Sequence, residues 1–239
     1  MSPAPAPNDL ITPITLAETA QLWWFCDGAI MDVGTRDHLH RSWGLCPRHS
    51  WLYFRAENEL KYQPLGNAVL TEDLTRRAAD LLDSHHRPHT KWQRLATADG
   101  CLTCDYLSTS PDGRDRFTKD MLAIQAGNRT RSWLTGYVDV WRHRRCPQCP
   151  NTATGDRSAP ASDGGITCRV HLLAEPDAHH PGELSGYLHD LTERLVACVK
   201  SMTADGPDRT MDSDAALVEA LGWLASWPPA EGWTAPRPR

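Results

Sequence analysis

The chain has little that would suit it to a membrane or to nucleic acid. None of its apolar runs approaches the roughly 20 residues that cross a bilayer. The opening Met1–Pro7 has neither the basic nor the apolar segment of a secretory signal. The formal net charge is −5, whereas nucleic-acid-binding domains are usually basic. We therefore expect a cytoplasmic protein that has no membrane partner and for which nucleic acid is a poor partner.

Motifs of several common enzyme classes are also missing. The sequence contains no Gly-rich phosphate loop, no His-Glu-x-x-His helix and no Gly-x-Ser-x-Gly elbow. The signature of zinc deaminases is absent as well, since Arg145 stands where a proline would precede Cys146. These absences remove the usual routes to a nucleotide-dependent, proteolytic or deaminating enzyme.

Strand-like alternation of polar and apolar residues is scarce, and helical periodicity dominates the chain. The fold class is therefore predicted to be mainly α. A capping box, Thr15-x-x-Glu18, should open a first helix that runs to Gly34. Its apolar stripe is Leu16, Trp23, Cys26, Ile30 and Val33. We predict further helices over residues 47–63, 65–83, 91–96, 114–126, 130–142, 181–204 and, in a short form, around 217–224.

The helix over 181–204 has the clearest pattern. Its apolar residues alternate at spacings of four and three, which is typical of a seam between two packed helices. They are Leu184, Leu188, Leu191, Leu195, Cys198 and Met202. Since Cys198 occupies a position that otherwise carries leucine, we predict that it is a core residue.

Cysteine is the most informative residue type, because most of the eight cysteines fall into short motifs in which two potential ligands are three residues apart. We call such a motif a clip. Two Cys-x-x-His clips and two Cys-x-x-Cys clips offer eight metal ligands. They are Cys46/His49, Cys168/His171, Cys101/Cys104 and Cys146/Cys149. In a reducing compartment such cysteines are ligands more often than disulfide partners.

Two pairings of the clips are open. In the one we favour, Cys146, Cys149, Cys168 and His171 form a zinc-ribbon-like set, and the remaining two clips form a second Cys₃His site. In the rival pairing, the Cys101/Cys104 clip joins the Cys168/His171 clip and leaves Cys146/Cys149 elsewhere.

Zn²⁺ fits mixed thiolate and imidazole ligation, so we predict two zinc ions. An iron–sulfur cluster is the alternative metal centre, although such clusters prefer ligands that are all thiolate. Cys26 has two interpretations. It sits on the apolar stripe of the first helix, as a core cysteine would, yet it is also a candidate additional ligand.

An internal repeat is suggested by Asp73–Arg77 and Asp190–Arg194, which read Asp-Leu-Thr-x-Arg and follow the two Cys-x-x-His clips. Aligning them superposes the core faces of two helices. Upstream, Cys149 precedes Cys168 by about the distance that separates Cys26 from Cys46, so Cys26 corresponds to Cys149. We therefore predict two diverged halves stapled by zinc clips. The boundaries are 1–13 (a disordered Pro-rich tail), 14–98 (first half), 99–204 (second half) and 205–239 (short helix and tail), with a long polar zinc loop at about 143–171.

The clips resemble those of uncharacterised bacterial proteins in which Cys-x-x-Cys and Gly-x-Cys-x-x-His recur on a helical scaffold. The resemblance rests on Gly44 to His49, Cys101/Cys104 and Cys168/His171. The second copy departs from the pattern, since Ile166 replaces the glycine. The resemblance implies a bacterial, metal-binding, helical protein and adds no reaction.

From the sequence we predict a zinc-binding module that acts on a protein partner through Trp-rich faces and the zinc loop. One alternative is a metalloenzyme with an open zinc site around Cys26, Cys46 and His49, since three protein ligands leave a position for water. A second is a DNA-binding regulator that uses the zinc loop and Arg142–Arg145.

Overall fold

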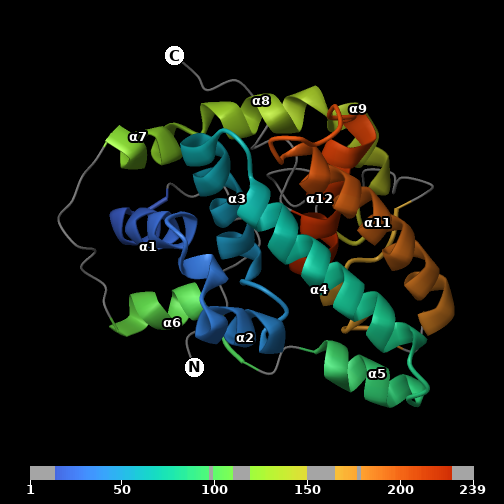
Figure 1. Ribbon diagram of the computed structural model, residues 1–239. Coiled ribbons are helices and arrows are strands. Elements are labelled where there is room, and N and C mark those ends of the chain that lie inside the picture. The colour runs from blue at the N-terminus through green and yellow to red at the C-terminus, as the bar shows by residue number, and fades with distance from the viewer. Residues whose placement is uncertain (1–13, 97–98, 110–118, 150–164, 177–178, 228–239) are drawn as a thin grey trace.

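The computed structural model describes residues 14–96, 99–109, 119–149, 165–176 and 179–227. These residues form helices and no strand, so the mainly-α prediction is confirmed (Figure 1). The predicted tail 1–13, the middle of the zinc loop and the end of the chain lie outside the described residues. The elements are α1 (Leu16–Cys26), η2 (Ala29–Met31), α2 (Val33–Arg41), α3 (Pro47–Lys61), α4 (Leu65–Asp83), α5 (Pro88–Leu95), α6 (Leu102–Thr109), α7 (Lys119–Ala126), α8 (Asn128–Gly136), α9 (Val138–Trp141), η3 (Arg142–Arg144), α10 (Arg169–Leu172), α11 (Pro181–Ser201) and α12 (Met211–Ala225).

The centre of the molecule is a pair of long helices, α4 and α11, which pack along each other (Figure 1). They run antiparallel, because Ser185 and His189 in the first half of α11 both bond the carboxylate of Asp83, the last residue of α4. The seam predicted for α11 is buried along its whole length, from Leu184 to Met202. The two helices carry the matching pentapeptides, and whether they arose by duplication stays a prediction.

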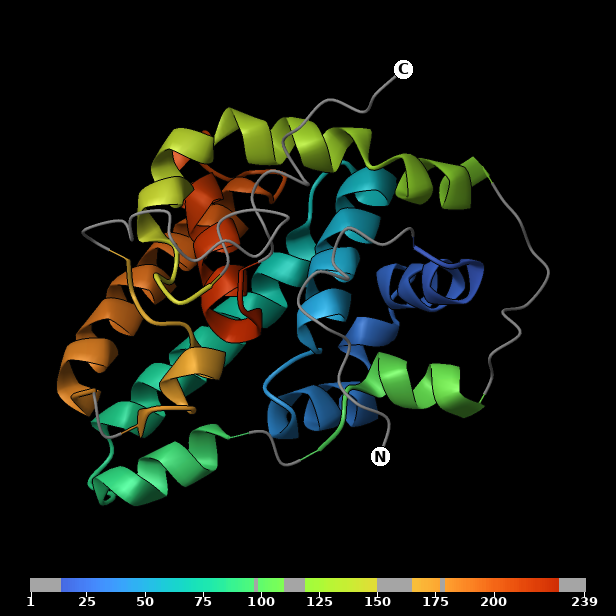
Figure 2. The same ribbon diagram turned by 180° about the vertical axis from the view of Figure 1, so that it is seen from behind.

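Helix α12 lies against this pair and also contacts α3, α9 and α10 (Figure 2). Residues 213–225 are all buried, since this helix is apolar around most of its circumference. The prediction of a short C-terminal helix was therefore wrong in extent. Two buried acids are compensated: Arg209 pairs with Asp214, and Arg144 and Arg194 pair with Glu219.

The first predicted helix is wrong in its length and in its buried face. Thr15 and Glu18 do form the capping box, but α1 ends at Cys26 because Gly28 adopts a left-handed backbone with φ of 116°. The predicted stripe is largely exposed at Leu16 (51%), Trp23 (38%) and Val33 (83%). The face that packs inward is instead made by Glu18, Thr19, Gln21, Leu22 and Phe25.

Three other elements differ from the sequence prediction. The segment around His38 and His40, predicted as a polar connection, is helix α2, whose N-cap Asp32 accepts from the Thr35 backbone N–H. The predicted helix over 130–142 is broken at Tyr137 into α8, α9 and η3. Helix α6 was not predicted and begins directly after Cys101.

Membrane crossing has no support in the described part of the chain, because none of its helices combines sufficient length with sufficient apolarity.

Candidate metal centres

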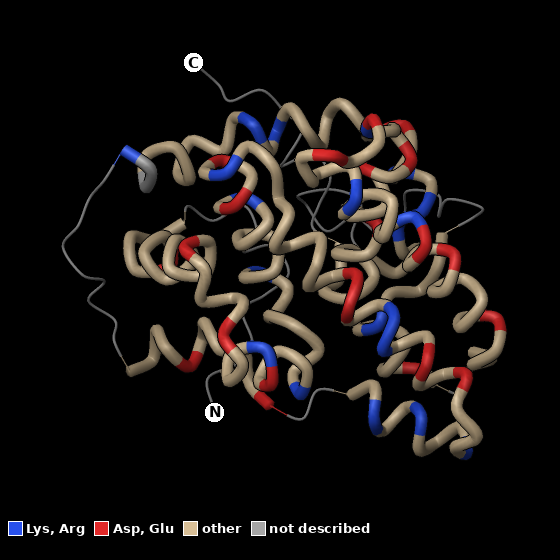
Figure 3. Tube along the Cα trace, in the orientation of Figure 1, with Lys and Arg blue, Asp and Glu red and all other residues tan. Residues whose placement is uncertain are grey.

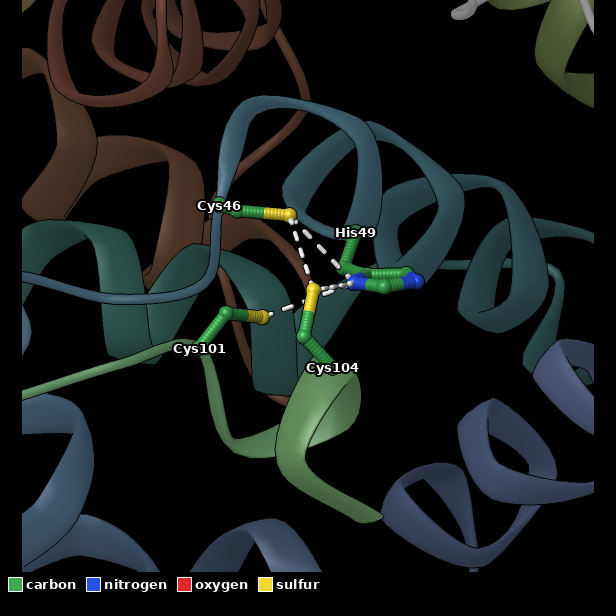
Figure 4. Close-up of side chains that lie close together, drawn as sticks. All are labelled: Cys46, His49, Cys101 and Cys104. Carbon is green, nitrogen blue, oxygen red and sulfur yellow. Dashed lines mark hydrogen bonds between the residues drawn. The ribbon is translucent and has the colours of Figure 1, made fainter. Parts of the chain in front are cut away.

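The first cluster joins two clips that lie more than fifty residues apart. Cys46 is the N-cap of α3 and His49 lies in its first turn, while Cys101 and Cys104 flank the start of α6 (Figure 4). The Nδ1 atom of His49 is 3.3 Å from the Cys46 sulfur, 3.4 Å from the Cys101 sulfur and 3.3 Å from the Cys104 sulfur. The Cys46 and Cys104 sulfurs are 3.9 Å apart. Four soft donors thus face one point.

The second cluster has the same composition. Cys168 is the N-cap of α10 and His171 lies one turn on, while Cys146 and Cys149 come from the turn after η3. The Nδ1 atom of His171 lies 3.5 Å from the Cys146 sulfur, 3.5 Å from the Cys149 sulfur and 3.2 Å from the Cys168 sulfur. The Cys149 and Cys168 sulfurs are 3.8 Å apart.

These separations are those of a tetrahedron around one ion. Metal–sulfur bonds of about 2.3 Å and metal–nitrogen bonds of about 2.0 Å place neighbouring sulfurs about 3.8 Å apart and sulfur and nitrogen about 3.5 Å apart. In each cluster the four donor atoms all lie within 4.8 Å of one another. Both clusters could therefore hold a metal ion through four protein ligands.

Both Cys-x-x-His clips use the same local device. The N-cap cysteine is extended, with φ −63° and ψ 165° at Cys46 and φ −69° and ψ 158° at Cys168. The histidine follows three residues later, so the thiol and the imidazole share one end of a helix. At Cys46 the next residue is Pro47, whose lack of an N–H costs nothing in a first helical turn. The sequence spacing alone therefore fixes two of the four donors.

The pairing of the clips follows the first of the two predicted arrangements. Cys101 and Cys104 lie beside Cys46 and His49, so the rival pairing of that clip with Cys168 and His171 is wrong. Cys26 belongs to neither cluster. It is partly buried at the end of α1, and desolvation raises the pKa of its thiol. Cys198 is fully buried in the seam of α11, and burial raises its pKa to about 12.

The donors interact strongly with one another without a metal. Hydrogen bonds from Cys104 and Cys46 hold the pKa of Cys101 well below its ordinary value. Burial lowers the pKa of His49, but hydrogen bonds to Cys101 and Cys104 outweigh it and raise that pKa to about 11. Hydrogen bonds to Cys146 and Cys149 likewise raise the pKa of His171 to about 10. Each cluster thus favours a thiolate beside an imidazolium, and a metal ion that binds there must displace protons.

Glu18 supports the first cluster from α1. Its Oε1 atom lies 3.3 Å from Nε2 of His49, the ring nitrogen that faces away from the sulfurs, and 2.6 Å from Nε of Arg48. Burial opposes ionisation, but the bonds from His49 and Arg48 hold the pKa of Glu18 well below its usual range. A carboxylate on the outer nitrogen fixes the tautomer and orientation of a ligand histidine. Sequence reasoning identified Glu18 only as part of a capping box.

The second cluster is closed by the end of α12. Ser226 Oγ lies 3.2 Å from the Cys149 sulfur, and the backbone N–H of Trp227 donates to the same sulfur at 3.4 Å. Donation to a thiolate stabilises its negative charge. Nothing in the local sequence marks these two residues, because they approach the cluster through the tertiary fold.

Glu18→Gln tests the support of His49. Glutamine can still accept from the Thr15 backbone N–H through its one carbonyl oxygen, so the change removes the charge and the acceptor opposite the imidazole. We expect the affinity of the first cluster for zinc to fall by about tenfold or more, as for other outer-shell partners of ligand histidines. Competition with a chromophoric chelator measures this. Glu193→Gln, on the exposed side of α11, is the matched control, and equal affinity in both variants would rule out the role given to Glu18.

Comparison with known proteins adds no further constraint on these sites. The chain matches no protein-family model, no curated protein and no solved structure. What the chain is able to bind follows from the donor geometry of the two clusters.

Proposed function

We propose that the chain is a zinc-binding protein whose two Cys₃His sites are structural staples, and that it acts by binding another protein. The observation that carries the structural role is the convergence of four donors in each cluster at tetrahedral spacings. Catalytic zinc keeps three protein ligands and one open position. A zinc ion held by four protein ligands cannot activate water without losing one of them.

Zinc is the metal that suits these donors best. Three thiolates and one imidazole are soft to borderline ligands, which select against Mg²⁺ and Ca²⁺. Iron–sulfur clusters are held mainly by thiolates alone, and each cluster here contributes one histidine.

Protein purified without added metal should contain two zinc ions per chain. Eight donors in two closed sets account for that number. Elemental analysis beside native mass spectrometry measures the identity and the count of the metals together. Iron with a visible charge-transfer band, or metal-free protein with four disulfides, would contradict the proposal.

The alternative of an open catalytic site loses its main support. It requires Cys26 as the third ligand beside Cys46 and His49, and Cys26 lies outside the cluster that contains them. Cys101 and Cys104 occupy the positions that would otherwise be open to water.

The DNA-binding alternative is also weakened by the surroundings of its basic residues. Arg144 forms ion pairs with Asp212 and Glu219. Arg145 is 5% exposed, so its guanidinium is poorly placed to reach a phosphate. Figure 3 shows Lys and Arg interspersed with Asp and Glu along the described trace, as on α2, α4 and α11. A DNA-binding face normally concentrates basic side chains.

A surface for a protein partner is best supported on α1. Leu16 and Trp23 are 51% and 38% exposed and lie seven residues apart, on one face of the helix, and Trp24 is 47% exposed beside them. Exposed aromatic side chains of this kind are enriched at protein interfaces. The prediction of Trp-rich faces is wrong for the rest of the described chain, because the other described tryptophans are buried. They are Trp43, Trp51, Trp92, Trp133, Trp141, Trp223 and Trp227.

The partner surface can be tested by replacing Trp23 and Trp24 together with serine. We expect the double variant to keep both zinc ions and its melting temperature and to lose a protein that co-purifies with the wild type. Met211→Ser is the matched control, because Met211 is a large apolar residue that is 56% exposed at the start of α12. A partner retained by the double variant would remove α1 as the docking surface.

A further inference from the structure

A hollow of about 510 Å³ opens where the end of α3 meets α8, on a part of the molecule that neither metal cluster occupies. Figure 1 shows α8 crossing the end of α3. None of the described residues that line the hollow is acidic. They are Asn58, Tyr62, Asn128, Arg129, Ser132, Trp133, Gly136, Tyr137 and Arg209.

Two hydrogen-bond donors of this lining are buried without an acceptor among the described residues. Asn58 is 2% exposed and its Nδ2 atom has no partner there, and the same holds for Nε1 of Trp133, which is 8% exposed. Buried donors are nearly always paired in folded proteins, and an exception is explained by a role or by a group that binds there. Both donors belong to side chains that line this one hollow.

Two guanidinium groups of the lining are held in place by aromatic rings. The guanidinium carbon of Arg129 lies 3.9 Å from the centre of the Tyr62 ring, and that of Arg209 lies 4.3 Å from the centre of the Trp133 ring. Arg209 is also anchored by Asp214 at 2.9 Å. Each guanidinium carries five N–H donors in a plane, so a stacked and anchored arginine still presents donors to an oxyanion.

The backbone at the mouth of the hollow is unusual as well. Tyr62 ends α3 in the left-handed region, with φ of 64°, and its side chain is 68% exposed. Non-glycine residues rarely adopt this conformation, and such residues concentrate at ligand sites. Here the conformation places the ring under Arg129. The rings of Trp133 and Tyr137 also contact each other, with their centroids 5.6 Å apart in an edge-on arrangement.

We infer that this hollow binds a small organic anion, whose carboxylate or phosphate is recognised by Arg129 and Arg209 and whose flat body packs against the aromatic rings. The guanidinium donors supply charge-assisted hydrogen bonds to the oxyanion. The rings supply apolar surface and fix the orientation, as in other small-molecule sites.

Calorimetry on the metal-loaded full chain tests this binding. The probes are benzoate, phenyl phosphate, inorganic phosphate and benzyl alcohol, which has the ring without the charge. We expect benzoate or phenyl phosphate to bind at least about tenfold more tightly than benzyl alcohol, which one charge-assisted hydrogen bond suffices to produce. Comparison of the two anions identifies the head group.

Inorganic phosphate that binds as tightly as phenyl phosphate would overturn the role of the rings. Equal binding of benzyl alcohol, or no anion binding up to about 10 mM, would overturn the proposal.

Two variants locate the binding. Arg129→Gln should lower the affinity for the anion that binds more tightly by about tenfold or more. Arg77→Gln, which removes the same charge from the exposed side of α4, should leave that affinity unchanged. In Gly136→Leu the new side chain meets no atom within 4 Å at its Cβ, so it enters open space without a clash. This variant should melt no lower than the wild type, because leucine favours helix over glycine, and should weaken binding. Unchanged affinity in both variants would place the anion elsewhere and refute the assignment.

Discussion

Cys168→Ser should release one of the two metal ions and lower the free energy of unfolding by about 4 kcal/mol or more, the range associated with loss of a structural metal. The Cys168 sulfur is fully buried and lies 3.2 Å from Nδ1 of His171 and 3.8 Å from the Cys149 sulfur. Without it the remaining donors form an incomplete set, and the segment that carries Cys146 loses its tie to α10. Native mass spectrometry and chemical denaturation measure the two effects.

Cys198→Ala is the control for that variant. Cys198 is as deeply buried as Cys168, but it lies in the seam of α11 and outside both clusters. The substitution should keep both metal ions and cost on the order of 1 kcal/mol through lost packing. Release of metal from the Cys198 variant would show that Cys198 is a metal ligand and not a packing residue.

The sequence predicts the parts of this protein whose physics is local. Helix α4 begins and ends where its apolar spacing and flanking residues indicate, and α11 buries the seam that its spacing describes. A cysteine at a helix N-cap and a histidine three residues on must share a helix end. The eight ligands could therefore be predicted from four short clips, whereas the clips that share one ion are brought together by the fold.

What the sequence could not supply depends on contacts between distant elements. The apolar stripe assigned to α1 is mostly exposed, because the helix instead turns Glu18 inward to bond with Arg48 and His49. A buried carboxylate of this kind has no signature in hydrophobic periodicity. Ser226 and Trp227 have no such signature either. They reach the second cluster because α12, which they follow, packs against α10.

The sequence also gave no basis for predicting which residues line the hollow at α3 and α8. Asn58 and Arg129 are separated by about seventy residues, and neither belongs to a recognised motif. The break in the predicted helix over 130–142 falls within this site, because Tyr137, at which α8 ends, lines the hollow.

Cys46→Ser and Cys101→Ser should each release the same single metal ion, whereas Cys26→Ala should release none. The Cys46 and Cys101 sulfurs lie 3.3 and 3.4 Å from Nδ1 of His49, and Cys26 lies outside the cluster. Metal counts in the three variants, and in the double Cys46/Cys101 variant, measure this. Loss of that metal in the Cys26 variant and its retention in the Cys101 variant would restore the open catalytic site.

The consequence for the fold should be local, in contrast to that of Cys168→Ser. Helix α6 has eight residues, of which only Thr103 is buried, and isolated helices of this length are unstable in water. The metal is therefore expected to supply much of what holds α6 against α1 and α3. In Cys46→Ser, hydrogen exchange across 102–109 should become nearly unprotected, while α4 and α11 keep their protection because their interface does not involve the first cluster. Protection of α6 that persists after metal loss would mean that packing alone holds it, and the first cluster would then need a role other than stapling.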